Sequence, residues 1–199
     1  MKMKSLVIAT AFGLGSLTLS AAAHAESPSF SYLSAGYTEI DEGTTFDGFE
    51  IEASGRLGRH AFLSGRYTDT SGSYSGLGSV DWESTLGRLG FIFGENQRVA
   101  AYAGPQVSYI STGLMWGPDN EWQAGSESST DWGAFGGVRA MVLPMLELNG
   151  EISYIDFDRN SFTSYAAGTK LYFTRNLAAT GQVRMGDLDG FTVGLSYNF

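Results

Sequence analysis

The end of the chain alternates strictly between two kinds of side chain. Phe191, Val193, Leu195, Tyr197 and Phe199 are apolar, and the residues between them are Thr, Gly, Ser and Asn. A period of two places successive side chains on opposite faces of an extended strand, whereas a helix needs a period near 3.6. The chain therefore ends in a predicted β-strand with one apolar and one polar face.

The same alternation recurs upstream. It predicts strands at 30–39, 48–57, 61–68, 80–93, 98–109, 132–143, 146–155, 164–173, 177–186 and 191–199. In 80–93, Leu86 and Ile92 fall on the face of Arg88, and a β-bulge near Ser84 would restore the parity. The segment 132–143 is also less regular. The chain is therefore predicted to be all-β, with ten strands.

The N-terminus has the three zones of a secretory signal peptide. Two lysines form a basic start, 6–19 is apolar or small and uncharged, and Ala23-His24-Ala25 has a small-x-small pattern. A membrane-anchor helix is the alternative, but the apolar stretch is shorter than the roughly 20 residues that a spanning helix needs. We predict cleavage after Ala25, so that residues 1–25 are removed and 26–199 fold.

Composition excludes several classes of function. The chain has 21 Asp and Glu against 12 Lys and Arg, and losing the two N-terminal lysines makes it more acidic still. Nucleic acid is therefore not an expected partner, because binding it requires a basic face. The absence of cysteine excludes thiol catalysis and Cys-ligated metals, and an exported chain of this kind is held together without disulfides.

Charge placement separates a soluble β-protein from a membrane β-barrel. The polar faces carry mostly Gly, Ser, Thr and Asn with single charged residues, which avoid the more apolar face. Arg or Lys facing lipid near the midplane would cost roughly 2–4 kcal/mol. Inside a narrow lumen, Arg and Glu can pair, which lowers the cost of burying them. The predicted lumen charges are Glu50, Glu52, Arg56, Arg66, Arg88, Arg139, Glu147, Glu151, Lys170 and Arg184.

Connections and aromatic residues indicate the two ends of this barrel. Connections at 58–60, 94–97 and 174–176 are short, whereas 40–47, 69–80, 110–131 and 156–162 are longer. Aromatic residues gather near the long connections (Tyr37, Phe49, Tyr67, Trp82, Tyr109, Trp132, Tyr154, Tyr165) and near the short ones (Phe62, Phe93, Phe173, Tyr197, Phe199). Membrane barrels have aromatic girdles at both interfaces and short periplasmic turns. Open strand edges are not tolerated in lipid, so Tyr32–Thr38 should pair with Thr192–Asn198.

Together, the signal peptide, the paired strands and the terminal Ser196-Tyr197-Asn198-Phe199 resemble the small outer-membrane β-barrel families, the OmpA-transmembrane, OmpX and opacity-type proteins. The resemblance implies an antiparallel up-and-down barrel in the outer membrane of a Gram-negative bacterium. It also implies that Phe191, Val193, Leu195, Tyr197 and Phe199 form the signal read by the barrel assembly machinery. The commonest of these small barrels have eight strands, which remains the alternative to ten.

An enzyme is not expected. Small barrels that are enzymes use a histidine at or near the outer rim, but His60, the one histidine after residue 25, falls in a short turn at the predicted periplasmic end. Asp187-Leu188-Asp189-Gly190 resembles the start of a calcium loop but lacks the downstream glutamate, so a tight turn is expected. No cofactor or metal site is predicted. Membrane lipids and lipopolysaccharide are the expected contacts. The acidic loops either share divalent cations with lipopolysaccharide or form a solvated surface.

Two functions remain open. The first is a structural or surface-interaction barrel that presents its loops, with the lumen charges as a plug. The second is a small porin-like channel, which would conduct weakly and favour anions. About eight strands leave room only for side chains, so ten enclose a narrow lumen. Trp116 and Trp122 make the longest loop aromatic, and they are candidates either for a contact site or for packing on the rim.

Overall fold

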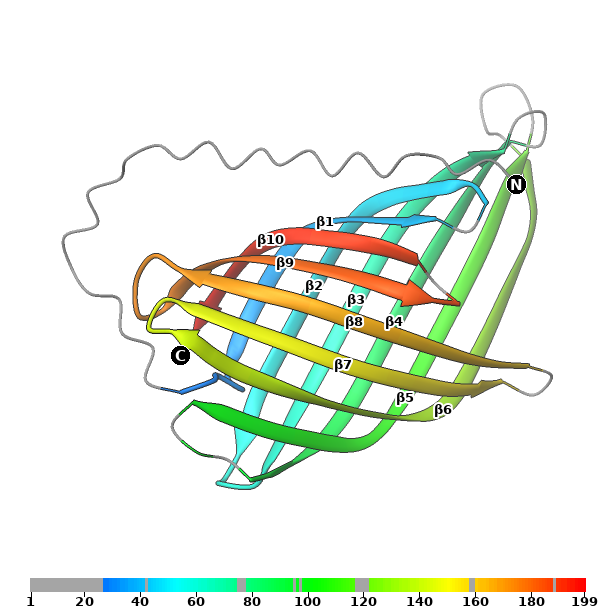
Figure 1. Cartoon of the computed structure of the whole chain (residues 1–199). Helices are drawn as coiled ribbons and strands as arrows, with labels where there is room; N and C mark the ends of the chain where they lie inside the picture. The colour runs from blue at the N-terminus through cyan, green and yellow to red at the C-terminus, as the bar shows by residue number, and fades with distance from the viewer. Residues whose placement is uncertain are drawn as a thin grey trace, which may run out of the picture.

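The computed structural model describes residues 27–41, 43–74, 78–94, 96, 98–116, 122–157, 160–187 and 189–199. These residues form a closed antiparallel barrel of ten strands, as predicted (Figure 1). The strands are β1 (Tyr32–Asp41), β2 (Thr45–Leu57), β3 (Ala61–Tyr74), β4 (Gly78–Phe93), β5 (Val99–Trp116), β6 (Trp122–Leu143), β7 (Leu146–Phe157), β8 (Asn160–Tyr172), β9 (Leu177–Gly186) and β10 (Asp189–Asn198).

The first and last strands close the barrel in the predicted register. Tyr32 lies opposite Asn198 and Thr38 opposite Thr192. The remaining strands pair in chain order, so every backbone strand pairing joins neighbours in the sequence except that of β1 with β10. Among the described residues, no helix is long and apolar enough to cross a membrane.

The strands connect at two different ends. At one end, which we call the turn end, short turns join β2–β3, β4–β5, β6–β7 and β8–β9, and the two ends of the strand sequence meet there. Two of these turns contain glycines at positive φ, Gly58 (68°) and Gly94 (63°), where another residue would be strained. The opposite end is called the loop end.

At the loop end, the predicted loops are mostly strand. β5 and β6 pair continuously from Val107↔Trp132 outward to Trp116↔Trp122, through the predicted loop 110–131, with one register shift at Leu114/Met115. The loops predicted at 40–47, 69–80 and 156–162 also shrink to short connections. The sequence prediction was wrong here because it relied on apolar side chains on the outward face, and beyond the lipid region the outward residues include Ser111, Ser128 and Thr130.

The expected bulge near Ser84 is also absent. β4 pairs with β3 in one unbroken register from Ala61↔Phe91 to Tyr74↔Gly78, so the parity of β4 never changes. Ile92 therefore lies buried on the same inward face as Arg88. The residue that the sequence treated as an irregularity is part of an apolar packing layer inside the barrel.

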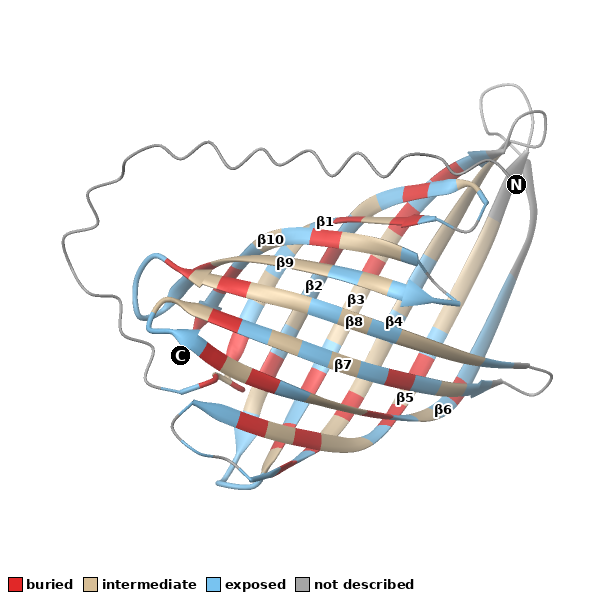
Figure 2. Ribbon diagram, in the orientation of Figure 1, coloured by how far each residue is buried: buried red, intermediate tan, exposed pale blue. Residues whose placement is uncertain are grey.

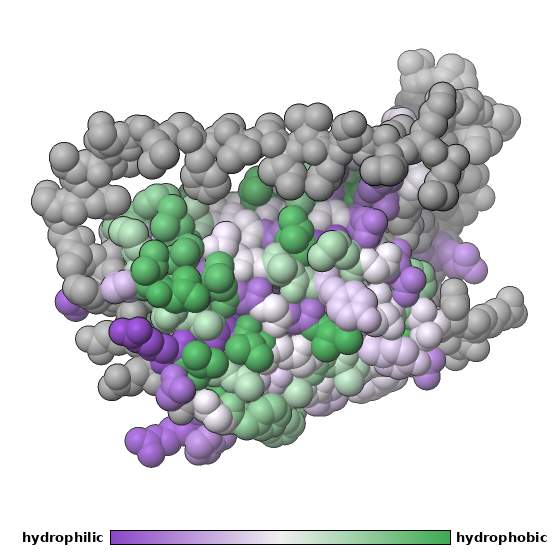
Figure 3. All heavy atoms as spheres, viewed as in Figure 1, coloured by the Kyte–Doolittle hydropathy of each residue, from purple (hydrophilic) through white to green (hydrophobic). Residues whose placement is uncertain are grey.

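The two faces of the wall differ as the alternation predicts. Figure 2 shows buried and exposed residues alternating along the strands. The exposed outward residues include large apolar side chains such as Leu63, Phe91 and Val193. On the face seen in Figure 3, apolar side chains gather on the wall toward the turn end. This apolar outer surface is what a lipid environment stabilises.

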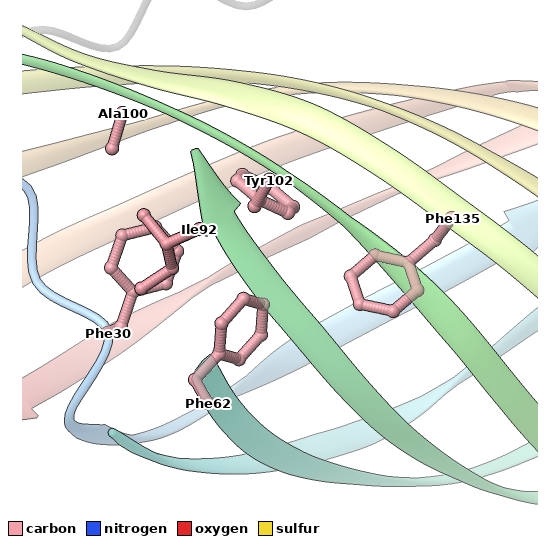
Figure 4. Packing of buried hydrophobic residues seen from close by; sticks show 6 residues of the cluster. All are labelled: Phe30, Phe62, Ile92, Ala100, Tyr102 and Phe135. Carbon is pink, nitrogen blue, oxygen red and sulfur yellow. The ribbon is translucent and has the colours of Figure 1, made fainter. Parts of the chain in front are cut away.

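Aromatic side chains fill the lumen near the turn end. Phe30, Phe62, Ile92, Ala100, Tyr102 and Phe135 form one buried cluster (Figure 4). The rings of Phe30 and Phe62 lie 4.9 Å apart, and Tyr102 meets Phe30 edge-on at 5.6 Å. Phe62 was predicted in the girdle facing lipid, but it is 2% exposed and points inward. Ser64 and Arg66, at the next alternate positions of β3, lie on the same inward face.

Candidate functional site: the charged lumen

Nine of the ten predicted lumen charges lie inside the barrel, buried or half-buried: Glu50, Glu52, Arg66, Arg88, Arg139, Glu147, Glu151, Lys170 and Arg184. Arg56 does not. It is exposed at the turn end, where its guanidinium lies 5.5 Å from the Phe30 ring. Its strand β2 ends one residue later, so its side chain has already passed out of the lumen.

Six of these side chains form what we call the paired layer: Glu50, Glu52, Arg66, Arg88, Glu151 and Arg184. Arg66 Nη2 lies 2.7 Å from Glu52 Oε2, and Arg66 Nε lies 3.7 Å from Glu50 Oε1. Arg184 Nη2 donates to Glu50 Oε2, which connects β9 to β2. Arg88 Nη1 lies 2.8 Å from Glu151 Oε1, which connects β4 to β7. Three arginines thus compensate three carboxylates across the lumen.

Tyrosine hydroxyls complete the paired layer. Tyr32 donates to Glu52 Oε1 at 2.5 Å, and Tyr102 donates to Glu151 Oε2 at 3.0 Å. The Tyr102 ring also belongs to the aromatic cluster, so one side chain joins the ion pairs to the apolar layer beside them. Buried ion pairs are stable only when such hydrogen bonds satisfy the remaining lone pairs.

Arg139, Glu147 and Lys170 form a second group, the surplus layer. Arg139 donates to the Ser29 carbonyl oxygen at 2.6 Å and to the Tyr32 hydroxyl at 3.1 Å, and its guanidinium lies 4.7 Å from the Phe30 ring. Glu147 Oε2 accepts from the Tyr172 hydroxyl at 3.0 Å. No ion pair within 4.0 Å joins these three described side chains to one another or to the paired layer.

The segment before β1 closes the lumen at the turn end. Ser54 Oγ donates to the Phe30 carbonyl oxygen at 2.8 Å, and the backbone N–H of Ser29 donates to Glu147 Oε2 at 3.4 Å. These bonds hold Phe30 inside the aromatic cluster, where it is 1% exposed. Between the surplus layer and the turn end, the lumen is therefore occupied by aromatic rings.

Two cavities lie farther along the lumen. One of about 70 Å³ lies among the two charged layers. The other, of about 120 Å³, lies toward the loop end, between the paired layer and apolar side chains that include Ile40, Trp82 and Ile155. Trp82 was predicted in the outer aromatic girdle, but the unbroken parity of β4 turns it into this cavity.

The structure also shows the positions of residues that the sequence analysis assigned wrongly or for which it left two roles open. Asp131 was assigned to a loop, but it lies in β6, is 8% exposed and accepts a hydrogen bond from Ser129 Oγ at 2.7 Å. Trp116 and Trp122 pair at the tip of the β5–β6 hairpin, and their side chains lie outside the described residues. Within the described part of the chain, no group of three or more His, Asp or Glu could hold a metal ion.

Only residues 187 and 188 connect β9 to β10, which is a short connection, as expected. Asp187 Oδ2 accepts from the backbone N–H of Thr163 at 2.7 Å, and Asp189 Oδ1 accepts from that of Gly186 at 3.0 Å. Gly186 has a φ of 125°, which favours glycine. Both carboxylates are thus engaged with backbone groups. His60 is exposed in the β2–β3 turn.

Comparison with known proteins now decides the family. The family model of the outer membrane protein beta-barrel domain matches residues 9–199. The chain belongs to this family. It is therefore an outer-membrane β-barrel, and its short turns face the periplasm while the loop end faces outward. No curated protein sequence matches the chain.

The chain is also similar to solved structures. The crystal structure of the outer membrane protein OprG from Pseudomonas aeruginosa is 12% identical, covers 84% of this chain and 94% of that chain, and superposes with a TM-score of 0.52. At this identity the likeness to OprG shows a shared fold alone. Ail, the attachment invasion locus protein of Yersinia pestis, is 12% identical over 84% of this chain and 95% of that chain, with a TM-score of 0.46.

Proposed function

We propose that this outer-membrane barrel acts at the cell surface, through the part of β3–β6 that rises beyond the bilayer. A membrane-spanning strand needs about 9–11 residues. β6 has 22 residues and β5 has 18, whereas β1, β9 and β10 have 10 each. The excess on one side of the barrel supports a role outside the membrane.

The outward side chains of β5 and β6 indicate where lipid contact ends. On β6 the outward side chains are apolar or small up to Trp132, which is 68% exposed, and Thr130 and Ser128 follow. On β5, Tyr109 lies opposite Thr130, one outward position beyond Trp132, and Ser111 follows it. We call the strand portions beyond this aromatic rim the extracellular wall: residues 69–74, 78–84, 110–116 and 122–131.

One edge of the wall is open. β6 pairs with β7 only between Trp132↔Asp156 and Leu143↔Leu146. Among the described residues, nothing pairs with that side of β6 from 122 to 131. Unpaired backbone N–H and C=O groups on a strand edge can accept an extended segment of another chain. This edge is the observation that carries the surface-interaction proposal.

The lumen supports the same conclusion. The aromatic cluster and the two charged layers fill it from the turn end to the middle, so we propose a plug. A small channel is the second candidate, because one cavity lies among the charged layers and the larger one makes the loop-side half of the lumen partly open. Conduction through the whole barrel would require the Phe30 segment and the ion pairs to move.

Replacing residues 112–127 by an Asn-Gly turn tests the surface role, because it joins the register partners Ser111 of β5 and Ser128 of β6 just above the rim. Bacteria that carry the shortened protein are compared with bacteria that carry the full-length protein for adhesion to polystyrene and to one another. We expect adhesion to fall to the level of cells without the protein, at equal surface amounts. Unchanged adhesion, together with ion conductance in bilayers, would favour the channel instead.

Further proposals concern export and contacts. We propose a Gram-negative source and contact of the acidic wall with lipopolysaccharide. We also propose that the signal peptide is removed after Ala25, which the mass of the mature protein tests.

A further proposal is that the β10 face of Phe191, Val193, Leu195, Tyr197 and Phe199 is read by the barrel assembly machinery. All five side chains point outward, and deleting Phe199 should lower the assembled fraction. We propose no enzymatic role, since the exposed His60 lies at the periplasmic end.

A further inference from the structure

We propose that the lumen contains a binding site for one small monovalent anion, such as a halide, at Lys170. The proposal is independent of the surface role. It rests on a buried cation without a hydrogen-bond partner, an unbalanced charge around it, and a cavity that this cation lines.

Lys170 is 7% exposed, on the inward face of β8. Its Nζ lies 3.5 Å from the centroid of the Tyr32 ring and has no hydrogen-bond partner. In the strand registers it lies between Glu147 on β7 and Thr180 on β9. One oxygen of the carboxylate opposite it is engaged elsewhere, since Glu147 Oε2 accepts from Tyr172 and Ser29, whereas Glu147 Oε1 is buried without a hydrogen-bond partner.

The charges around Lys170 do not balance. Arg139 from β6, Glu147 from β7 and Glu52 from β2 interact with it electrostatically. Glu52 is already compensated by Arg66, which lies 2.7 Å from it. The surplus layer therefore contains two cations and one carboxylate, whereas the paired layer contains three of each. A buried charge without compensation destabilises the folded state, so a counter-ion is favoured.

The 70 Å³ cavity offers space for that counter-ion. Lys170, Arg139 and Arg88 line it, and the Nε atoms of both arginines are also buried without a hydrogen-bond partner. Thr180 and Gln182 from β9 line the same cavity and can donate from a hydroxyl and an amide. The carboxylates that line it, Glu50, Glu52 and Glu151, are each bound by an arginine. Three cationic side chains, each with a nitrogen that has no hydrogen-bond partner, therefore line one polar space.

Bromide is the probe for this site. The refolded protein, residues 26–199, is crystallised with sodium bromide, and anomalous scattering locates the ion. We expect one internal bromide within contact distance of Lys170 Nζ. Water alone in the cavity, or bromide bound only on the outer surface, would overturn the proposal.

Halide-dependent stability gives a second readout. Urea unfolding is compared in sodium bromide and in sodium gluconate at equal ionic strength, because gluconate is too large for the cavity. At a bromide concentration ten times its Kd, the folded-to-unfolded ratio should rise roughly tenfold. Lys170→Gln should lose this dependence, and Arg184→Gln, which removes a cation of the paired layer, should keep it. Equal bromide dependence in Lys170→Gln and the unchanged protein would contradict the site.

Discussion

The paired layer and the surplus layer lie side by side in one lumen but compensate their charges differently. In the paired layer, each carboxylate meets an arginine from another strand, and Arg88–Glu151 and Arg184–Glu50 join strands far apart in the sequence. In the surplus layer, Arg139 and Lys170 face aromatic rings, a carbonyl and a hydroxyl. The first layer therefore cross-links the barrel, whereas the second stores an excess positive charge next to its aromatic floor.

The largest expected effect comes from breaking the paired layer. Glu151→Gln removes the carboxylate of Arg88 while keeping the shape of the side chain. Because the arginine is then buried without its partner, we expect a loss of about 3–5 kcal/mol in the free energy of unfolding. Urea unfolding of the refolded barrel in lipid vesicles measures it.

A matched double variant sharpens this prediction. Arg88→Gln combined with Glu151→Gln removes both charges and should recover most of the lost stability, since no uncompensated charge remains. If the double variant is as unstable as the sum of its two single variants, the pair does not act as a unit.

Removing the aromatic floor should have a somewhat smaller effect. Phe62→Ala deletes a buried ring that packs on Phe30, which in turn faces Arg139 of the surplus layer. We expect a loss of about 3 kcal/mol, because large-to-small substitutions leave a cavity. Thermal or urea unfolding measures it, and Phe93→Ala, at an exposed position near the same end, is the control. Equal losses for both variants would contradict an internal floor.

The smallest expected effect separates the layers most clearly. Lys170→Met removes the surplus cation and fills its space with an apolar chain. We expect the free energy of unfolding, measured without halide, to change by less than about 1 kcal/mol or to rise, because a buried charge without a partner is removed. A loss as large as that of Glu151→Gln would show that Lys170 is fully compensated by protein groups.

The barrel itself could be read from the sequence because lipid imposes a strict alternation. The β10 alternation was predicted, and so was the pairing of segment Tyr32–Thr38 with Thr192–Asn198, which Tyr32↔Asn198 and Thr38↔Thr192 confirm. The extracellular wall could not be predicted in this way. Beyond Tyr109 and Trp132 the outward residues are polar, as at Ser111, Ser128 and Thr130, so the outward apolar alternation ends and the hairpin has the same pattern as a loop.

The interior was only partly predictable. Parity alone placed Arg88 and Glu151 inside, but pairing across the lumen depends on the tilt and stagger of strands far apart in sequence. Phe62 was misassigned because an aromatic residue near a turn fits a girdle as well as a core. Its parity with Ser64 and Arg66 was the signal for its true position. The unbroken register of β4 could likewise not be predicted without knowing the apolar cluster in which Ile92 is buried.

Single-channel conductance of the refolded barrel, residues 26–199, in planar bilayers tests whether the lumen is plugged. A plugged lumen predicts no discrete openings from the correctly folded protein, because the Phe30 cluster and the paired layer obstruct the path. Discrete openings whose ion selectivity changes in Arg88→Ala or Glu147→Ala would contradict it, and would make the lumen charges the filter of a pore.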